Sequence, residues 1–228
     1  MTKRQALTGE PRGSIPVSPQ GWPFILTLLF AAIVCFVLCW TVTGIICALL
    51  LLFCLNFFRD PERETPEGDL VICPADGKVI RAETRKDGSI RIDIFMNVFN
   101  VHVNRAPMTG TITAVDYIEG RFVNASFDSA SQENERNRFQ LEAENGAVIT
   151  FTQISGLIAR RIISYVKEGD HVQAGERIGM IRFGSRVDTL IPEGYTLNVK
   201  VGDHVVAGST ILAKSTADAQ YEDELAGS

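Results

Sequence analysis

The chain lacks a basic surplus and has few histidines and cysteines. Its 228 residues carry 22 Lys and Arg against 27 Asp and Glu, which gives a formal net charge of −5. No basic stripe interrupts that balance, so the sequence does not favour nucleic acid as a partner. Only three histidines are present, and no CxxC pair or Cys/His cluster occurs. We therefore expect no metal site.

Cysteine is scarce, and its distribution does not suggest a disulfide framework. Four of the five cysteines fall in one apolar N-terminal block, and only Cys73 lies outside it. The four are Cys35, Cys39, Cys47 and Cys54. We interpret them as small apolar side chains that fill space within a membrane helix.

Apolar residues are concentrated in one run from Trp22 to Phe58. Residues 1–22 before it are polar, and we expect them to form a disordered cytoplasmic tail. The run is much longer than the apolar core of a signal peptide, which has about 7–15 residues. Because no small-residue cleavage site follows it, we expect the run to be retained. It exceeds the ~20 residues of one membrane span and falls short of two spans.

We predict that residues 23–58 form a membrane-embedded helical hairpin. Thr41, Thr43 and Gly44 weaken the middle of the run and suit a turn. Two arms of about 15–16 residues each reach about 24 Å of a ~30 Å hydrocarbon core. Basic residues flank both ends, which favours a cytoplasmic position for both. They are Lys3, Arg4 and Arg12 before the run, and Arg59 and Arg63 after it. A single tilted span is the alternative.

The sequence changes character from Thr65 onward. Apolar and polar residues alternate over short lengths, as in Ile90-Arg-Ile-Asp-Ile-Phe95, and Gly, Pro or Asp interrupt them about every 8–12 residues. This pattern indicates many short strands, so we predict a mainly β domain over residues 59–214. The polar stretch 126–138 is predicted to be a loop or a short helix. Residues 215–228 are predicted to form a disordered acidic tail.

One short sequence occurs twice, 33 positions apart. Val166–Gly175 reads VKEGDHVQAG and Val199–Gly208 reads VKVGDHVVAG. Each copy predicts a turn between two strands, in which Gly169 or Gly202 supplies a positive φ and the next Asp bonds its own backbone. Two such halves related by a pseudo-twofold axis resemble the barrel-sandwich core of lipoyl and biotinyl domains, over residues 160–213.

The link between the two copies contains Phe183-Gly184-Ser185-Arg186. Carrier domains have their modified lysine at this place, and the absence of a lysine argues against a swinging-arm carrier. The Gly-Ser pair is either an ordinary turn or a reactive peptide bond. His171 and His204 occupy equivalent positions in the copies, so we interpret both as structural.

Five short motifs occur in a characteristic order. They are Asn56-Phe-Phe-Arg-Asp-Pro61, Pro74-Ala-Asp-Gly77, His102 followed by Pro107 and Gly110, Asn134-Glu-Arg136, and Phe183-Gly184-Ser185. In this order they resemble the phosphatidylserine decarboxylases, and specifically the short membrane-associated bacterial form. The resemblance covers residues ~56–192. It implies a self-cleaving proenzyme at the bacterial inner membrane with its catalytic domain in the cytoplasm.

The resemblance assigns the cleavage to the bond between Gly184 and Ser185. Ser185 would attack the carbonyl of Gly184, where no side chain blocks the approach. The products would be a β chain that ends at 184 and an α chain that begins at 185 and carries a covalent pyruvoyl group derived from Ser185. The ordinary alternative is a Gly-Ser turn.

Asp76 and His102 are the candidate bases that the resemblance implies. With the serine they would form a triad-like set of nucleophile, base and orienting group. The alternative for Asp76 is a turn residue before Gly77, and for His102 a satisfied histidine on a strand. The chain departs from the longer family members in two places. Arg105 stands where a second histidine is usual, and Arg186 stands where Ser or Thr is common.

The resemblance implies decarboxylation of phosphatidylserine to phosphatidylethanolamine. The substrate's amine would form a Schiff base with the pyruvoyl group, and His102 would donate the proton that replaces the lost carboxylate. The implied partners are the phospholipid in the membrane, the two cleaved chains held together, and further copies of the protein. The alternative function is a membrane-anchored adaptor without enzymatic activity, built on a lipoyl-like module.

Overall fold

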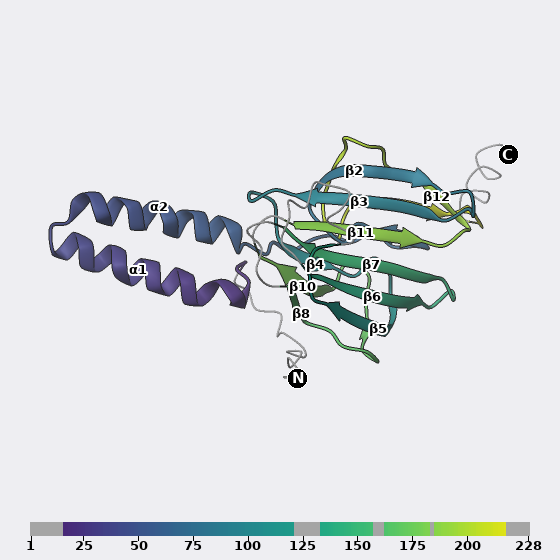
Figure 1. Cartoon of the computed structure of the whole chain (residues 1–228), viewed down its shortest axis with the longest axis horizontal. Coiled ribbons are helices and arrows are strands. Elements are labelled where there is room, and N and C mark those ends of the chain that lie inside the picture. Colours follow the sequence, from purple (N-terminus) through teal and green to yellow (C-terminus); the bar gives the residue numbers. More distant parts are fainter. Residues whose placement is uncertain (1–15, 121–132, 157–161, 183–184, 218–228) are drawn as a thin grey trace. The chain divides into compact units, whose positions relative to one another are not determined.

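A computed structural model describes residues 16–120, 133–156, 162–182 and 185–217 of the chain (Figure 1). The chain forms two compact units, which are described separately. Of the described residues, the smaller comprises 16–62 and Phe99–Val101. The larger comprises Arg63–Val98 and the described residues from 102 to 217.

The smaller unit consists mainly of two helices that run side by side (Figure 1). A short 3-10 helix, Pro19–Gly21, leads into α1 (Trp22–Val37), and α2 spans Thr41–Phe57. In the described part of the chain, Pro19–Val37 is the one stretch long and apolar enough to cross a membrane, with 19 residues and a mean hydropathy of 2.0. The apolar α2 is shorter, with 17 residues.

The turn between the helices lies earlier than the sequence predicted. The chain reverses between α1 and α2 around Cys39, whose φ of 60° is in the left-handed region. Thr41 begins α2, and Gly44 lies within it. A Cβ on Gly44 would lie 2.9 Å from the Phe36 ring, so this glycine allows the helices to approach closely. The prediction of a turn at Thr41–Gly44 is therefore wrong, because Gly44 serves helix packing.

The larger unit is mainly β, as predicted. Its strands are β1 (Leu70–Ile72), β2 (Gly77–Thr84), β3 (Ile90–Met96), β4 (Val103–Arg105), β5 (Gly110–Ile118), β6 (Arg136–Ala143), β7 (Val148–Ser155), β8 (Ile162–Ser164), β9 (His171–Val172), β10 (Arg177–Ile181), β11 (Ser185–Ile191), β12 (Tyr195–Leu197), β13 (His204–Val205) and β14 (Ile211–Ser215). Since β6 begins at Arg136, the prediction of a loop or helix as far as residue 138 is wrong at its end. The polar residues there belong to a strand with one exposed face.

The strands form three antiparallel sheets. Their orders are β1-β14-β12, β4-β10-β8 and β13-β2-β3-β11-β7-β6-β5-β9. The two small sheets correspond strand for strand, since β1, β12 and β14 begin 33 or 34 positions away from β4, β8 and β10. The large sheet has the same symmetry. Counted inward from one edge, β13, β2, β3 and β11 correspond to β9, β5, β6 and β7 counted inward from the other edge. The unit thus has two equivalent halves of seven strands, and β4–β10 form one half inserted between β3 and β11 of the other.

The repeated sequence gives the equivalent turns of these halves. Gly169 and Gly202 have φ values of 88° and 102°, as the sequence predicted. The carboxylate of Asp170 accepts a hydrogen bond from the backbone N–H of Lys167 at 2.9 Å, and Asp203 accepts one from Lys200 at 3.0 Å. The equivalence extends well outside residues 160–213, and the strands of that range are shared among all three sheets. The likeness to a lipoyl domain stays a prediction.

Two glycines bring the backbones together at equivalent corners. A Cβ on Gly77 would lie 2.2 Å from the carbonyl oxygen of Phe95, and a Cβ on Gly110 would lie 2.2 Å from that of Glu142. No side chain fits at either position, because the obstacle is backbone. Glycine is thus required at positions 77 and 110 for the same physical reason.

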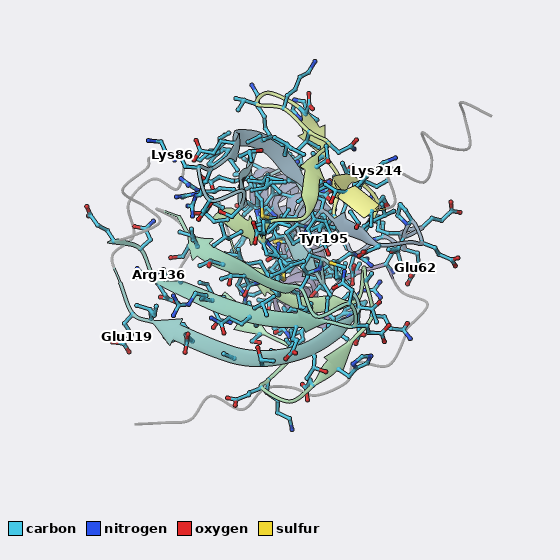
Figure 2. The ribbon with its side chains drawn as sticks, turned by 90° about the vertical axis from the view of Figure 1, so that its right-hand side faces the viewer. Glu62, Lys86, Glu119, Arg136, Tyr195 and Lys214 are labelled. Atoms are coloured by element: carbon cyan, nitrogen blue, oxygen red, sulfur yellow. The ribbon has the colours of Figure 1, made fainter. Side chains whose placement is uncertain are left out.

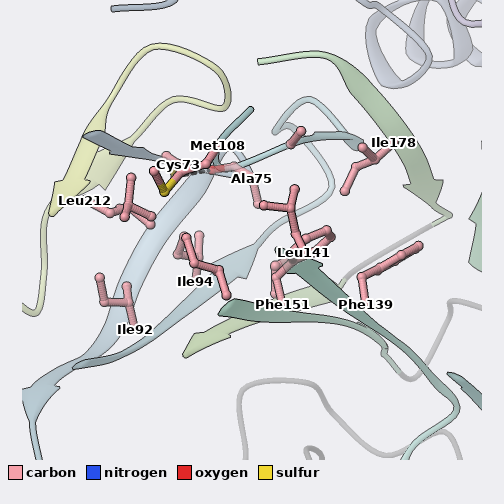
Figure 3. Close-up of a cluster of buried hydrophobic side chains, with 14 of the residues drawn as sticks. Cys73, Ala75, Ile92, Ile94, Met108, Phe139, Leu141, Phe151, Ile178 and Leu212 are labelled. Atoms are coloured by element: carbon pink, nitrogen blue, oxygen red, sulfur yellow. Dashed lines mark hydrogen bonds between the residues drawn. The ribbon is translucent and has the colours of Figure 1, made fainter. Parts of the chain in front are cut away.

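The hydrophobic core lies against one face of the large sheet (Figure 3). Alternate residues of its strands point inward, including Ile92 and Ile94 of β3 and Phe139 of β6. The Phe139 ring stacks on Phe151 of β7 at a centroid distance of 4.9 Å. Charged side chains such as Lys86, Glu119 and Lys214 lie at the periphery of the larger unit when it is viewed from the side (Figure 2).

Candidate active site

Ser185 is the first residue of β11, in the middle of the large sheet. It pairs with Met96 of β3 on one side and with Ser155 of β7 on the other. Its side chain is fully buried, and its Oγ donates to the Met96 Sδ at 3.2 Å. Gly184, the predicted partner in the cleaved bond, and Phe183 lie outside the described residues. Strands on both sides therefore fix the position of residue 185.

The inward face of the sheet becomes polar at the end where Ser185 lies. Val187 and Ile191, which alternate with it along β11, belong to the hydrophobic core. Beside Ser185, the same face carries Ser155 and Gln153 of β7, both fully buried. A few polar side chains gathered at one end of an otherwise apolar face are typical of a site that binds a ligand.

Asn104 of β4 closes this polar end. Its Nδ2 lies 3.8 Å from the Met96 Sδ and donates to the carbonyl of Pro74 at 3.3 Å. Its Oδ1 accepts a hydrogen bond from the Gln153 amide at 2.8 Å. One sulfur atom thus contacts both Ser185 and Asn104.

His102 directly precedes β4 and is fully buried. Its carbonyl accepts a hydrogen bond from the backbone N–H of Ile181 at 3.3 Å. Along an extended chain, side chains two residues apart share a face. His102 and Asn104 are two residues apart, so the histidine side chain is expected on the side of Ser185 if the chain stays extended there. Its role as acid and base stays a prediction.

Asp76 accepts two hydrogen bonds and is 8% exposed. Its Oδ1 binds the backbone N–H of Ala207 at 2.8 Å, and its Oδ2 pairs with the Arg63 guanidinium at 3.2 Å. In the equivalent half, the Thr109 hydroxyl accepts from the backbone N–H of Ala174 at 3.0 Å. One oxygen of Asp76 therefore stabilises the turn at Ala207, as the Thr109 hydroxyl stabilises the equivalent turn at Ala174. Unlike Thr109, Asp76 has a second oxygen, which pairs with Arg63. The catalytic role of Asp76 stays a prediction.

Arg105 and the two repeated histidines have other contacts. The Arg105 guanidinium donates to the carbonyl of Gly175 at 2.9 Å, so it holds one of the repeated turns. His171 and His204 begin the edge strands β9 and β13, and both are exposed. The nearest groups to the His171 ring are the Thr111 hydroxyl at 3.4 Å and the Glu144 carboxylate at 3.9 Å. The structural role of the two repeated histidines stays a prediction.

Arg186 points to the opposite face of the sheet and is fully buried there. Its guanidinium lies 2.5 Å from the carboxylates of both Asp93 and Asp188. Arg91 pairs with the same two carboxylates, at 2.9 and 3.2 Å. Burial and the charge of Asp93 raise the pKa of Asp188 to about 6, while Arg186 and Arg91 act in the lowering direction. The departure from the family pattern at residue 186 thus belongs to a buried charge network.

The sequence alone did not identify Met96, Asn104, Gln153 or Ser155 as part of the site. Asn104, Gln153 and Ser155 are polar residues at inward strand positions. That signal becomes visible only once the strand boundaries and the inward face are known. Met96 gives no such signal, because a methionine at an inward position is ordinary core.

Comparison with known proteins identifies the family of the chain. The family model described as phosphatidylserine decarboxylase matches residues 50–213. The chain is 50% identical to the phosphatidylserine decarboxylase proenzyme of Nitratidesulfovibrio vulgaris over 216 residues, which cover 90% of this chain and 97% of the relative. It is 44% identical to the protein of that name in Burkholderia ambifaria, with coverage of 87% and 95%. For the protein of that name in Paraburkholderia phymatum, the identity is 45% and the coverage 87% and 96%.

Proposed function

The chain belongs to the phosphatidylserine decarboxylase family, and we propose that it converts phosphatidylserine to phosphatidylethanolamine after cleaving itself between Gly184 and Ser185. One observation carries the proposal. Ser185 is a fully buried hydroxyl at the start of a central strand, at the polar end of the sheet's inner face. An ordinary surface turn would leave a Gly-Ser pair in water.

In the proposed cleavage, the Ser185 Oγ forms a bond to the Gly184 carbonyl carbon as the peptide C–N bond breaks. The amide thereby becomes an ester, and His102 or Asp76 carries the hydroxyl proton to the nitrogen of residue 185, which becomes a free amine. Removal of the Cα hydrogen of residue 185 then breaks the bond between its Cβ and Oγ, forms a Cα–Cβ double bond (dehydroalanine) and leaves Gly184 as a carboxylate. Addition of water and loss of ammonia then give a pyruvoyl group at residue 185.

The residues around Ser185 suit a small carbonyl-bearing group. Pairing with Met96 and Ser155 would hold the new chain end, and the buried position would exclude water. A pyruvoyl group supplies a carbonyl that reacts with an amine and accepts the electron pair left when carbon dioxide departs. His102 would supply the replacing proton, because an imidazole titrates near neutral pH.

The two chains would remain associated after cleavage. Residues 185–228 supply β11, which lies between β3 and β7, and β13, which pairs with β2. They also supply β14, which lies between β1 and β12. Of these neighbours, only β12 belongs to the same cleaved chain. Separation would therefore break strand pairs in two of the three sheets.

We propose that the helical unit lies in the cell membrane with both its ends in the cytoplasm. At ~1.5 Å per residue, helices of 16 and 17 residues are about 24–26 Å long, less than a ~30 Å hydrocarbon core. A shallow hairpin fits these lengths. Protease treatment of sealed vesicles would digest an N-terminal tag on the cytoplasmic face, whereas a single span would protect the tag or the larger unit.

The test of the proposed activity is a lipid assay with purified protein in detergent micelles. Wild-type protein should release carbon dioxide from phosphatidylserine and form phosphatidylethanolamine, and the Ser185→Ala variant should form none. Ser209→Ala is a matched control, since that serine lies in a turn and its hydroxyl binds only the carbonyl of Glu64. Equal lipid conversion by wild type and Ser185→Ala would contradict the proposal, and no conversion by either would favour the adaptor.

A further inference from the structure

Three buried acceptor atoms near Ser185 have no hydrogen-bond partner among the described residues. They are the Glu135 Oε1, the Asn137 Oδ1 and the Gln153 Oε1. Their residues are 7%, 3% and 0% exposed. A buried acceptor left without a donor destabilises the fold, and a charged one does so more strongly. Three such atoms in one region indicate that a donor-rich ligand completes them.

The strand register places Glu135 in one row with Ser185. Ser185 pairs with Ser155, and Ser155 in turn donates from its backbone N–H and its hydroxyl to the carbonyl of Glu135, both at 2.9 Å. Paired residues of antiparallel strands share a face of the sheet. The Glu135 side chain therefore lies on the inward face of Ser185.

Gln153 and Asn137 form the next row on the same face. They pair with each other across β6 and β7, and Gln153 also pairs with Val187 of β11. Both lie two residues from the first row, Gln153 from Ser155 and Asn137 from Glu135. The three acceptors therefore surround one region of the inward face, directly beside the small Ser155.

The space between Glu135 and Ser185 suits a small polar group. Two strand spacings separate the two residues, or roughly 10 Å between backbones. Ser155 is the residue between them in this row, and its side chain is small. A substituted amine that donates hydrogen bonds could bridge the two residues.

We propose that Glu135, supported by Asn137 and Gln153, binds the ammonium group of the substrate's serine headgroup beside residue 185. An ammonium has up to three N–H donors and a positive charge, which match three acceptors of which one is a carboxylate. The inference rests on the proposed function, and it adds a catalytic residue that contacts the substrate. It also assigns a role to the Asn134-Glu-Arg136 motif, which has no part in the proposed cleavage.

The same carboxylate prepares the amine for reaction. An ammonium has no free electron pair and cannot attack a carbonyl. Transfer of one proton to the Glu135 Oε1 breaks an N–H bond and leaves the pair on nitrogen. Glu135 then acts as a general base whose product, a neutral carboxyl, is suited to a buried position.

The test compares Glu135→Gln with Glu142→Gln, a control on the exposed face of β6, the strand that directly follows Glu135. Both variants should split into two chains by intact mass. Both should also bind hydroxylamine at residue 185 as fast as wild type, because that neutral nucleophile needs no ammonium site. Glu135→Gln should raise the KM for phosphatidylserine in micelles at least tenfold, and Glu142→Gln should leave it unchanged.

A binding measurement isolates the ammonium. Phosphatidylethanolamine carries an ammonium group, whereas phosphatidylethanol has none. Phosphatidylethanolamine should therefore inhibit the wild-type enzyme more strongly than phosphatidylethanol does. Glu135→Gln should reduce that preference at least tenfold. An unchanged preference would overturn the inference, as would a folded Glu135→Gln that fails to split.

Two further experiments distinguish a failure of this inference from misfolding of the variant and from a failure of the proposed function. If Glu135→Gln does not fold, as judged by its melting temperature, Asn137→Leu takes its place. Retention of the full ammonium preference by Asn137→Leu would overturn the inference. Wild-type protein that neither splits nor decarboxylates would contradict the proposed function itself, before the variants are compared.

Discussion

Arg186 and Asp93 form an ion pair in which both side chains are fully buried, with 2.5 Å between the guanidinium Nη2 and the carboxylate Oδ2. Arg186 immediately follows Ser185, and Asp93 belongs to β3, on the other side of the proposed cut. After cleavage the pair would join the two chains next to the new chain end. A buried pair of this kind stabilises little relative to apolar residues, but the loss of Arg186 would leave the buried Asp93 carboxylate with the partly exposed Arg91 and Arg81 as its remaining cations.

Arg186→Met should therefore lower the free energy of unfolding by about 3–5 kcal/mol. Arg138→Met is the matched control, because Arg138 pairs with Asp116 at 2.9 Å while both side chains are about half exposed. An exposed pair contributes about 0–1 kcal/mol. Denaturant unfolding of the two variants measures the difference, and equal losses would contradict the assignment of Arg186 to a buried network.

Asp188 should make stability depend on pH in the weakly acidic range. Its pKa rises from 3.8 to about 6 in the folded protein. Below pH 3.8 the Asp188 carboxyl is protonated in both the folded and the unfolded protein. As the pH rises above 3.8, the unfolded chain loses this proton at a lower pH than the folded protein does. Stability should therefore fall as the pH rises through 6, by at most about 3 kcal/mol.

Asp188→Asn removes this titration. The melting temperature of wild type relative to Asp188→Asn should decline between pH 4 and pH 7, because only wild type then acquires an unfavourable buried charge. Asp116→Asn, an exposed carboxylate on β5, serves as the control. A constant difference across that range would show that Asp188 stays ionised in the fold.

The equivalence of Asp76 and Thr109 separates the structural role of Asp76 from its proposed catalytic one. Each accepts one hydrogen bond from a backbone N–H, so Asp76→Ala and Thr109→Ala should each cost about 1–3 kcal/mol of stability. Only Asp76→Ala should also slow chain cleavage, because Thr109 lies in the other half. Cleavage rates followed by intact mass test this, and equal slowing in both variants would leave Asp76 only its role in the turn.

The backbone corners at Gly77 and Gly110 should be equally intolerant of a side chain. At either position a Cβ would overlap a carbonyl oxygen of the neighbouring strand. Gly77→Ala and Gly110→Ala should each yield little folded protein, while Gly146→Ala should fold, because nothing lies within 4 Å of its Cβ position. Since Gly146 has a φ of 84°, some loss of stability is expected there as well. Normal yields of the first two variants would contradict the close approach.

The sequence predicted the mainly β class and the turns of the repeat because those features are local. Alternation over short segments indicated strands, and the repeated Gly-Asp pairs predicted turns with positive φ at Gly169 and Gly202. The extent of the repeat was not predicted, because the half formed by β4–β10 is inserted between β3 and β11. Pairing of strands distant in sequence leaves no local pattern. The early end of α1 was missed because Gly44 packs against Phe36 instead of forming a turn.

The candidate site was predicted only in part, for a related reason. Ser185, His102 and Asp76 occur in short motifs, whereas Met96, Asn104 and Gln153 meet only through the sheets. Glu135 lay within a stretch predicted to be a loop or a short helix. Its buried position follows from the register of β6 and β7, which the sequence does not specify.

Intact mass spectrometry under denaturing conditions tests the central claim most directly. Wild-type protein should give two chains, with residues 185–228 as the smaller one, bearing a pyruvoyl group in place of a free amino terminus. Ser185→Ala should give one chain of 25.1 kDa, less one oxygen atom. A single intact chain from wild type, under conditions in which it decarboxylates phosphatidylserine, would contradict the account.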